Sequence, residues 1–271
     1  MTASTPMPTV FIPHGGGPCF FMQDPPGLEG MWDKMASYLK GIRASLPRQP
    51  KAILVISAHW ETNVPTVMTA PKPGMLFDYY GFPAHTYELS YPAPGSPELA
   101  QRVKELLQQD GFPVAEDSSR GFDHGVFIPF LLMFPEADIP VIQLSMQQNL
   151  DPATHLKMGK ALEALRHEDV LIVGSGLSFH NLRIFFSGGQ ADPASAAFHE
   201  WLGQSVTADA QTREAQLSQW SKAPGARHCH PREEHLLPLM VVAGAAGNDA
   251  GVVSYQDRII GKSVGGYHFG A

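Results

Sequence analysis

Short apolar runs alternate along this chain with segments of helical periodicity, and turn-forming residues separate them. Such runs are typical of strands that are buried on both faces of a parallel sheet, and strands that alternate with helices indicate an α/β fold. The expected strands are residues 9–12, 52–57, 64–70, 141–145, 170–173 and 251–254. The expected helices are residues 28–45, 97–109, 152–166, 193–208 and 233–246. The sequence therefore predicts a mostly parallel central sheet flanked by helices.

Capping residues support three of these helices. Ser96, Asp151 and Asp192 each stand directly before a proline, which is a favoured order at the start of a helix. The chain has 271 residues and shows no internal repeat or low-complexity linker, and this length suffices to bury one full core. We therefore expect residues 1–271 to form a single domain, in which the long segments 71–95 and 113–130 are functional loops.

Charge and composition exclude several classes of partner. The net charge is −7 and no run of Lys or Arg occurs, so nucleic acid and anionic membranes are not expected partners. The first residues do not resemble a secretory signal, and no apolar run approaches the roughly 18 residues of a membrane span. Two cysteines, Cys19 and Cys229, suggest free thiols in a reducing cytoplasm.

Three of the 12 histidines share a structural context. His14, in "FIPHGGGP", directly follows the first expected strand, and His59 follows the second by two residues. His180 lies beyond the strand 170–173 and a Gly-Ser-Gly turn. The carboxyl ends of parallel strands form the edge that holds ligands in open α/β sheets. His235 is expected in the first turns of the last helix, near the same edge.

Histidines that converge from distant segments suggest a mononuclear metal site. The pattern alone is equally compatible with polar loop histidines in a protein that binds no metal. A local metal clip of His228, Cys229 and His230 with His235 is less favoured, because His228 and His230 would face opposite sides of an extended segment. "HGGGP" does not match a phosphate-binding loop, and Ser175 does not have the spacing of a nucleophile elbow.

Five segments, in this order, resemble a known family. They are "FIPHGGGP", "ILVISAHWET", "GFDHGVFIPF", "VLIVGSGLSFHN" and "REEHLLPLMVVAGAAG". Together they are similar to the class III extradiol ring-cleavage dioxygenases, and within that superfamily to the 4,5-DOPA extradiol dioxygenase-like branch. The resemblance spans about residues 8–269, so it implies one catalytic domain.

The resemblance implies a mononuclear non-haem Fe(II) enzyme that uses O₂ to open a catechol ring beside its two hydroxyls. His14 and His59 match two metal ligands. The third ligand matches His235, although the neighbouring Glu234 would supply the carboxylate that related enzymes use. A site rich in nitrogen would also hold Zn²⁺.

The resemblance also implies catalytic roles. His180 matches the active-site acid/base and lies close enough to the metal to act as a fourth ligand, and His124 matches a histidine beside the substrate. Glu61 is expected to accept a hydrogen bond from a ligand imidazole. The aromatic segment 76–92 is expected to line or cover the pocket.

Two alternatives stay open on the same fold, a zinc-dependent hydrolase and a non-catalytic metal-binding protein. The expected partners are a small catechol and O₂, in a cytoplasmic monomer or small homo-oligomer. The sequence leaves the ring substituent open, because no cationic residue stands out for a substrate carboxylate. His230 and Arg183 are weak candidates for that role.

Overall fold

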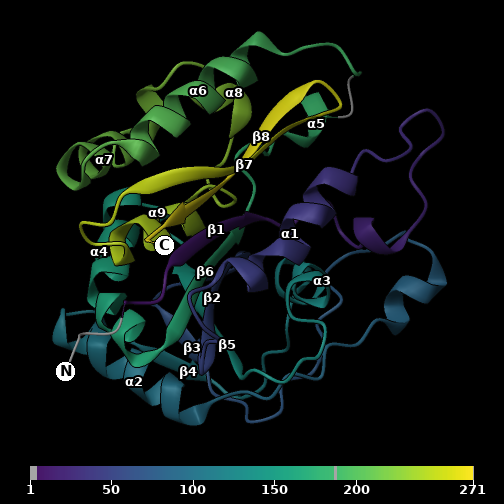
Figure 1. Ribbon diagram of the computed structural model, residues 1–271. Helices are drawn as coiled ribbons and strands as arrows, with labels where there is room; N and C mark the ends of the chain where they lie inside the picture. The colour runs from purple at the N-terminus through teal and green to yellow at the C-terminus, as the bar shows by residue number, and fades with distance from the viewer. Residues whose placement is uncertain (1–4, 186–187, 271) are drawn as a thin grey trace.

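The computed structural model describes residues 5–185 and 188–270. Its centre is an open sheet of eight strands in the order β4-β3-β5-β2-β6-β1-β8-β7 (Figure 1). The strands are β1 Thr9–Pro13, β2 Ala52–Thr62, β3 Thr66–Met68, β4 Ala115–Asp117, β5 Val141–Gln147, β6 Val170–Gly176, β7 Gly251–Ile259 and β8 Lys262–Phe269. The central strands β5, β2, β6 and β1 run parallel to one another, which confirms the predicted mostly parallel sheet.

The helices surround this sheet. Those in the described part of the chain are α1 Asp33–Ser45, α2 Pro97–Gln109, α3 His124–Met133, α4 Pro152–Leu162, α5 Leu182–Phe185, α6 Pro193–Thr207, α7 Ala210–Leu217, α8 Ala226–Cys229 and α9 Leu237–Ala245. The side chains of Ser96, Asp151 and Asp192 each accept a hydrogen bond from a backbone N–H three residues later. The predicted starts of α2, α4 and α6 are therefore confirmed.

Two adjacent residues of β6 show how the layers are arranged. A side chain at Gly174 would collide with Pro238 of α9, whereas Ser175 donates a hydrogen bond to the carbonyl of Gly125 in α3. Because successive strand residues face opposite sides of a sheet, α9 and α3 cover opposite faces (Figure 1). Every residue of α9 is buried, since this helix lies between the sheet and α4.

The structure corrects the position of two histidines. β2 extends to Thr62, so His59 lies within the strand rather than after it. A shift in the pairing with β5 between Ile56 and Glu61 marks this extension. The last helix begins at Leu237 rather than at residue 233, which places His235 in the turn before it.

Other departures follow from unusual composition. The expected loop 113–130 contains β4 and the start of α3, because α3 is apolar all round and lacks the amphipathic period that would identify it. The late strand at 251–254 belongs to an antiparallel hairpin of β7 with β8 rather than to the parallel set. Glycines within "KSVGGYHF" hide β8 from a propensity-based assignment.

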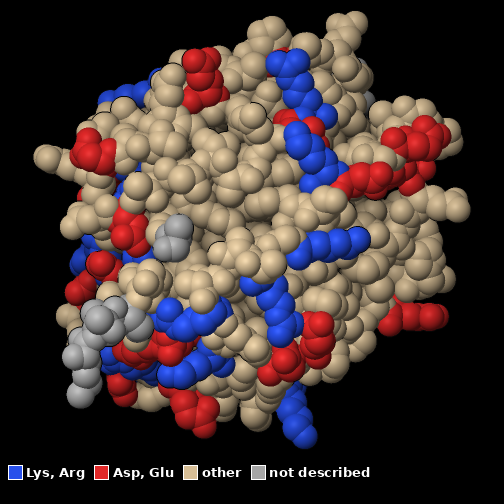
Figure 2. Space-filling model, in the orientation of Figure 1, with Lys and Arg blue, Asp and Glu red and all other residues tan. Residues whose placement is uncertain are grey.

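The surface agrees with the expected balance of charge. On the face shown in Figure 2, basic side chains lie beside acidic ones instead of forming one broad basic field. Among the described residues, no helix has both the length and the apolar character needed to cross a bilayer. Cys19 and Cys229 are free, as expected, and both are buried.

Candidate metal centre

Three histidines predicted from distant segments meet at the carboxyl edge of the sheet. His14 follows β1, His59 lies near the end of β2, and His235 precedes α9. Each offers a ring nitrogen, and the three nitrogens all lie within 4.8 Å of one another. The Nε2 atoms of His14 and His59 are 3.2 Å apart. Two nitrogens that bind one ion at ~2.0–2.1 Å stand about 3.0–3.4 Å apart, so this pair fits a shared metal.

Hydrogen bonding fixes the tautomer of His14. Its Nδ1 lies 3.0 Å from the hydroxyl of Ser175, and that hydroxyl donates its single proton to the carbonyl of Gly125. The hydroxyl must therefore accept from Nδ1–H of His14, which leaves the Nε2 lone pair free. Sequence reasoning examined Ser175 as a nucleophile and missed this orienting role.

Glu234 lies behind two imidazoles rather than among the three nitrogens. Its Oε1 is 3.0 Å from Nδ1 of His235 and 3.0 Å from Nδ1 of His180. These two rings stack with their centroids 3.4 Å apart. The carboxylate accepts hydrogen bonds from both rings and leaves each Nε2 available. These contacts favour His235 over Glu234 as the third metal ligand.

Asp78 holds His124 in a similar way. Its Oδ1 accepts from the backbone N–H of His124 at 3.0 Å and from ring Nδ1 at 2.8 Å. The centroid of the His124 ring lies 4.0 Å from that of His59. Asp78 belongs to the segment 76–92. The aromatic residues of this segment were predicted to line the pocket, but the role of its carboxylate was not predicted.

The metal-facing histidines are neutral at neutral pH. Burial and the neighbouring imidazoles lower the pKa values of His14 and His235 well below the ordinary value. Burial and the nearby His124 lower the pKa of His59 to about 4. Neutral imidazoles bind a cation without first losing a proton, so the trio is ready to accept a metal.

The supporting carboxylates are ionised. Burial alone would raise the pKa of Asp78, but its hydrogen bonds from His124 hold that pKa below its usual value. The pKa of Glu234 is likewise lowered, because the contact with His180 outweighs the effect of burial. Ionised carboxylates are acceptors only, and they therefore direct the Nδ1–H groups of the imidazoles away from the cavity.

Acid should destabilise the metal-free protein. Between the ordinary pKa of 6.5 and the folded pKa of about 4, His59 binds more protons in the unfolded chain. The free energy of unfolding therefore falls as the pH drops through this window, by about 1.4 kcal/mol per pH unit for one such group. Urea unfolding with a chelator present, at several pH values, measures the slope. His59→Gln should flatten it, and an unchanged slope in this variant would contradict the assignment.

A buried carboxylate stabilises the end of β2. Asp123 is fully buried and accepts hydrogen bonds from Ser57 at 2.7 Å, Gln143 at 2.8 Å and Arg120 at 2.8 Å. Arg120 also donates to the backbone carbonyl of His59 at 3.2 Å. Because the buried charge is fully paired, this network fixes the strand that carries His59.

Three sequence-based candidates have other partners. Glu61 pairs with Arg232 and not with an imidazole, so its expected role is wrong. His228 binds Asp192 at 2.7 Å, and the buried Nε2 of His230 lies 3.0 Å from a backbone carbonyl. Residues 226–229 form a helix rather than the extended segment that was expected. The local metal clip of His228, Cys229, His230 and His235 is not formed, because His228 and His230 bind these other partners.

Five histidines line one cavity of about 570 Å³. They are His14, His59, His124, His180 and His235. Gly15 and Gly17 of "HGGGP" line it too, with φ values of +79° and +54° that favour glycine. A Cβ at Gly17 would stand 2.8 Å from the ring of Phe82. Phe82 brings the segment 76–92 to the pocket, on the same side as the histidines.

The sequence matches a family model described as the catalytic LigB subunit of aromatic ring-opening dioxygenase, over residues 8–270. The chain belongs to this family. The resemblance to extradiol dioxygenases is thereby confirmed, and membership supports an oxygenase. Enzymes of the LigB family depend on a metal, and the histidine and carboxylate cluster described above is able to bind one.

Individual relatives agree with this placement. Dioxygenase tasH of Hapsidospora irregularis is 40% identical over 285 residues, which cover 99% of this chain and 88% of the relative. The 4,5-DOPA dioxygenase extradiol of Beta vulgaris is 46% identical over 222 residues, or 77% and 82% of the two chains. The crystal structure of the uncharacterised protein JW3007 from Escherichia coli K12 superposes with a TM-score of 0.79 at 32% identity, covering 97% of this chain and 100% of that one.

Proposed function

We propose that the protein is an Fe(II)-dependent extradiol dioxygenase that opens a catechol-type ring. The observation that carries the proposal is the convergence of three neutral imidazoles with two further histidines on one cavity. Several relatives bear the name 4,5-DOPA dioxygenase extradiol, and DOPA is a catechol. The catechol ring is therefore the part of the substrate that we assign.

His14, His59 and His235 would hold the metal, with His180 within reach. When bound, Fe(II) supplies a centre that holds both catechol oxygens and activates O₂. An all-nitrogen trio also suits Zn²⁺, so we expect zinc in protein prepared without added iron. The neutral state of the trio means that no ligand proton competes with the metal at pH 7.

His180 would act as the acid/base. Its Nδ1 is occupied by the Glu234 carboxylate, so Nε2 is the atom left to take a proton from a catechol hydroxyl. The adjacent carboxylate then stabilises the imidazolium that forms. The same proton is available to an oxygen of the opened ring, so one residue serves as base and later as acid.

His124 would position the substrate. Asp78 holds both its backbone and its Nδ1, which leaves Nε2 to bond a catechol oxygen. The ring belongs to the first residue of α3, and its place on the cavity wall argues against a purely local capping role.

Oxygen uptake tests the proposed function. The metal-free protein is loaded with Fe(II) under nitrogen, and then a catechol and O₂ are added. Ring opening should consume one O₂ for each catechol lost and yield a yellow semialdehyde. Protein loaded with zinc should consume none. Hydrolysis of an ester without O₂ would instead support the zinc hydrolase, and binding of metal with neither reaction would support a non-catalytic protein.

Ser175→Ala should weaken metal binding. The substitution removes the acceptor of His14 Nδ1–H, and loss of such an outer partner costs about 10–100-fold in affinity. Competition with a chelator measures the metal dissociation constant. Ser205→Ala is a matched control, because Ser205 is also fully buried but bonds to the carbonyl of Trp201 within α6. Equal losses in the two variants would show a general effect of removing a buried hydroxyl.

A further inference from the structure

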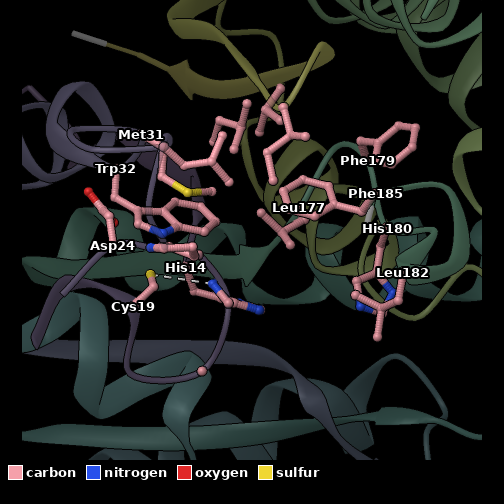
Figure 3. Close-up of a pocket in the computed structure, with 18 of the residues that line it drawn as sticks. His14, Cys19, Asp24, Met31, Trp32, Leu177, Phe179, His180, Leu182 and Phe185 are labelled. Carbon is pink, nitrogen blue, oxygen red and sulfur yellow. Dashed lines mark hydrogen bonds between the residues drawn. The ribbon is translucent and has the colours of Figure 1, made fainter. Parts of the chain in front are cut away.

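The cavity is larger than a catechol ring needs, and much of its wall is apolar. An apolar cavity of about 150 Å³ holds one benzene ring, whereas this one has a volume of about 570 Å³. We use "apolar chamber" for the part of the cavity that is lined by Met31, Trp32, Leu177, Phe179, Ile260 and Val264. In Figure 3, Met31 and Trp32 lie on one side of this space, and Leu177 and Phe179 on the other.

Within residues 5–185 and 188–270, no lysine or arginine side chain lines the cavity. Arg183 is exposed and outside the lining, and the buried His230 faces a backbone carbonyl. Lys262 donates to the carbonyl of Gly188 at 2.6 Å. A substrate carboxylate would therefore lose hydration without gaining a cationic partner, which is costly.

The charged group that does line the cavity has the wrong sign for a carboxylate. Asp24 is part of the wall, and its Oδ2 accepts from the backbone N–H of Gly30 at 2.7 Å. Its negative charge would repel an acidic substituent. The side-chain amide of Asn181, which also lines the cavity, is engaged as well, since it donates to the carbonyl of His228 at 2.8 Å.

The turn between β7 and β8 places an apolar side chain on the cavity wall in an unfavourable backbone conformation. Ile260 and Gly261 connect the strands with φ values of +47° and +76°. Two-residue loops with two positive φ angles favour Asn-Gly, and a β-branched residue is an outlier there. Ile260 nevertheless occupies the first position and lines the cavity. Such strain is typical of positions that shape a site.

The geometry points to a catechol that carries an uncharged apolar substituent as the preferred substrate. Its two hydroxyls would face the histidines, and its alkyl or aryl group would occupy the apolar chamber. This inference rests on the proposed function and adds the nature of the substituent. It departs from the amino-acid substituent of DOPA, which carries both a carboxylate and an ammonium group.

Binding without turnover tests the inference directly. Zinc-loaded protein under nitrogen is titrated calorimetrically with 4-methylcatechol, 4-propylcatechol, dopamine and 3-(3,4-dihydroxyphenyl)propionate. Each buried methylene should tighten binding about fourfold, so the propyl compound should bind about 15-fold more tightly than the methyl compound. Both charged compounds should bind about tenfold more weakly than 4-propylcatechol, or worse. Binding of the propionate as tight as that of 4-propylcatechol would overturn the inference, and so would equally tight binding of dopamine, which would identify Asp24 as an ammonium acceptor.

Ile260→Asn provides a variant that the backbone should tolerate. Asn suits the positive φ, so the thermal midpoint should not fall. The advantage of the propyl over the methyl compound should shrink from about 15-fold to below about fivefold, since one apolar wall is lost. Val252→Asn is the matched control, because Val252 is 52% exposed on β7 and does not line the cavity. An unchanged advantage in Ile260→Asn would remove Ile260 from the chamber and overturn the inference.

Oxygen uptake by iron-loaded protein separates this inference from the proposed function. Preferred cleavage of the propionate or of DOPA would leave the dioxygenase standing and overturn the apolar substrate. Failure to cleave any catechol would overturn the dioxygenase and the substrate inference with it, even if the calorimetric series showed an apolar chamber. Preferred cleavage of 4-propylcatechol supports both.

Discussion

His180→Gln should lower the rate of ring opening by about 10²–10⁴-fold, the usual contribution of a general acid/base. The metal content should stay near that of the unchanged protein, because three other nitrogens remain. His180 lines the cavity while Glu234 holds its Nδ1, so Nε2 is the nitrogen left to act, and glutamine offers no basic nitrogen in its place. The measurement combines metal per chain with the rate of oxygen uptake in the same preparation.

Two comparisons make this result specific. His199→Gln changes a partly buried histidine that does not line the cavity, and it should leave the rate unaltered. His124→Gln should reduce the rate less than His180→Gln, because we place His124 in substrate positioning. Parallel loss of metal and activity in His180→Gln would make His180 a ligand. A larger loss in His124→Gln would mean that the two roles are exchanged.

The approximate position of the ligands could be predicted from the sequence, because parallel strands bring their carboxyl ends to one edge of the sheet. His14 and His180 follow strands that are short, apolar and bounded by glycine, and such strands are identified from the sequence alone. His235 was predicted at the same edge although its helix begins later than expected. An error of a few residues at the end of an element does not move a side chain to another edge of the sheet.

The partners of the histidines could not be predicted in the same way. Ser175, Asp78 and Glu234 each orient an imidazole, and two of them come from segments distant in sequence from their histidine. Such contacts depend on side-chain direction across layers, which periodicity does not encode. Glu61 shows the converse error, since its nearness to His59 in the sequence suggested a contact that Arg232 makes instead.

The size and polarity of the cavity were equally inaccessible. Its wall joins residues from the segment before α1, the segment after β6 and the tip of the β7–β8 hairpin. The sequence pattern does not indicate β8, so Ile260 could not be placed at a turn from the sequence alone. The sequence offers no obvious cationic residue for the substrate, and in the described part of the chain no lysine or arginine lines the cavity.

His235→Ala should empty the metal site, whereas Glu234→Gln should keep it filled. Removing a direct ligand costs more than the roughly 10–100-fold that loss of an outer partner costs, so metal content should fall close to zero after dialysis against a chelator. The amide oxygen of glutamine still accepts hydrogen bonds from Nδ1 of His235 and His180. Glu234→Gln should therefore bind metal within about 100-fold of the unchanged affinity.

Activity in these variants separates the roles of the two side chains. His235→Ala should have no measurable turnover, because the site lacks metal. Glu234→Gln should turn over slowly with metal bound, since a neutral amide cannot stabilise the imidazolium of His180. Metal analysis and oxygen uptake on matched samples give both values. The opposite pattern, with metal lost in Glu234→Gln and kept in His235→Ala, would make Glu234 the third ligand and would restore a site of two histidines and one carboxylate.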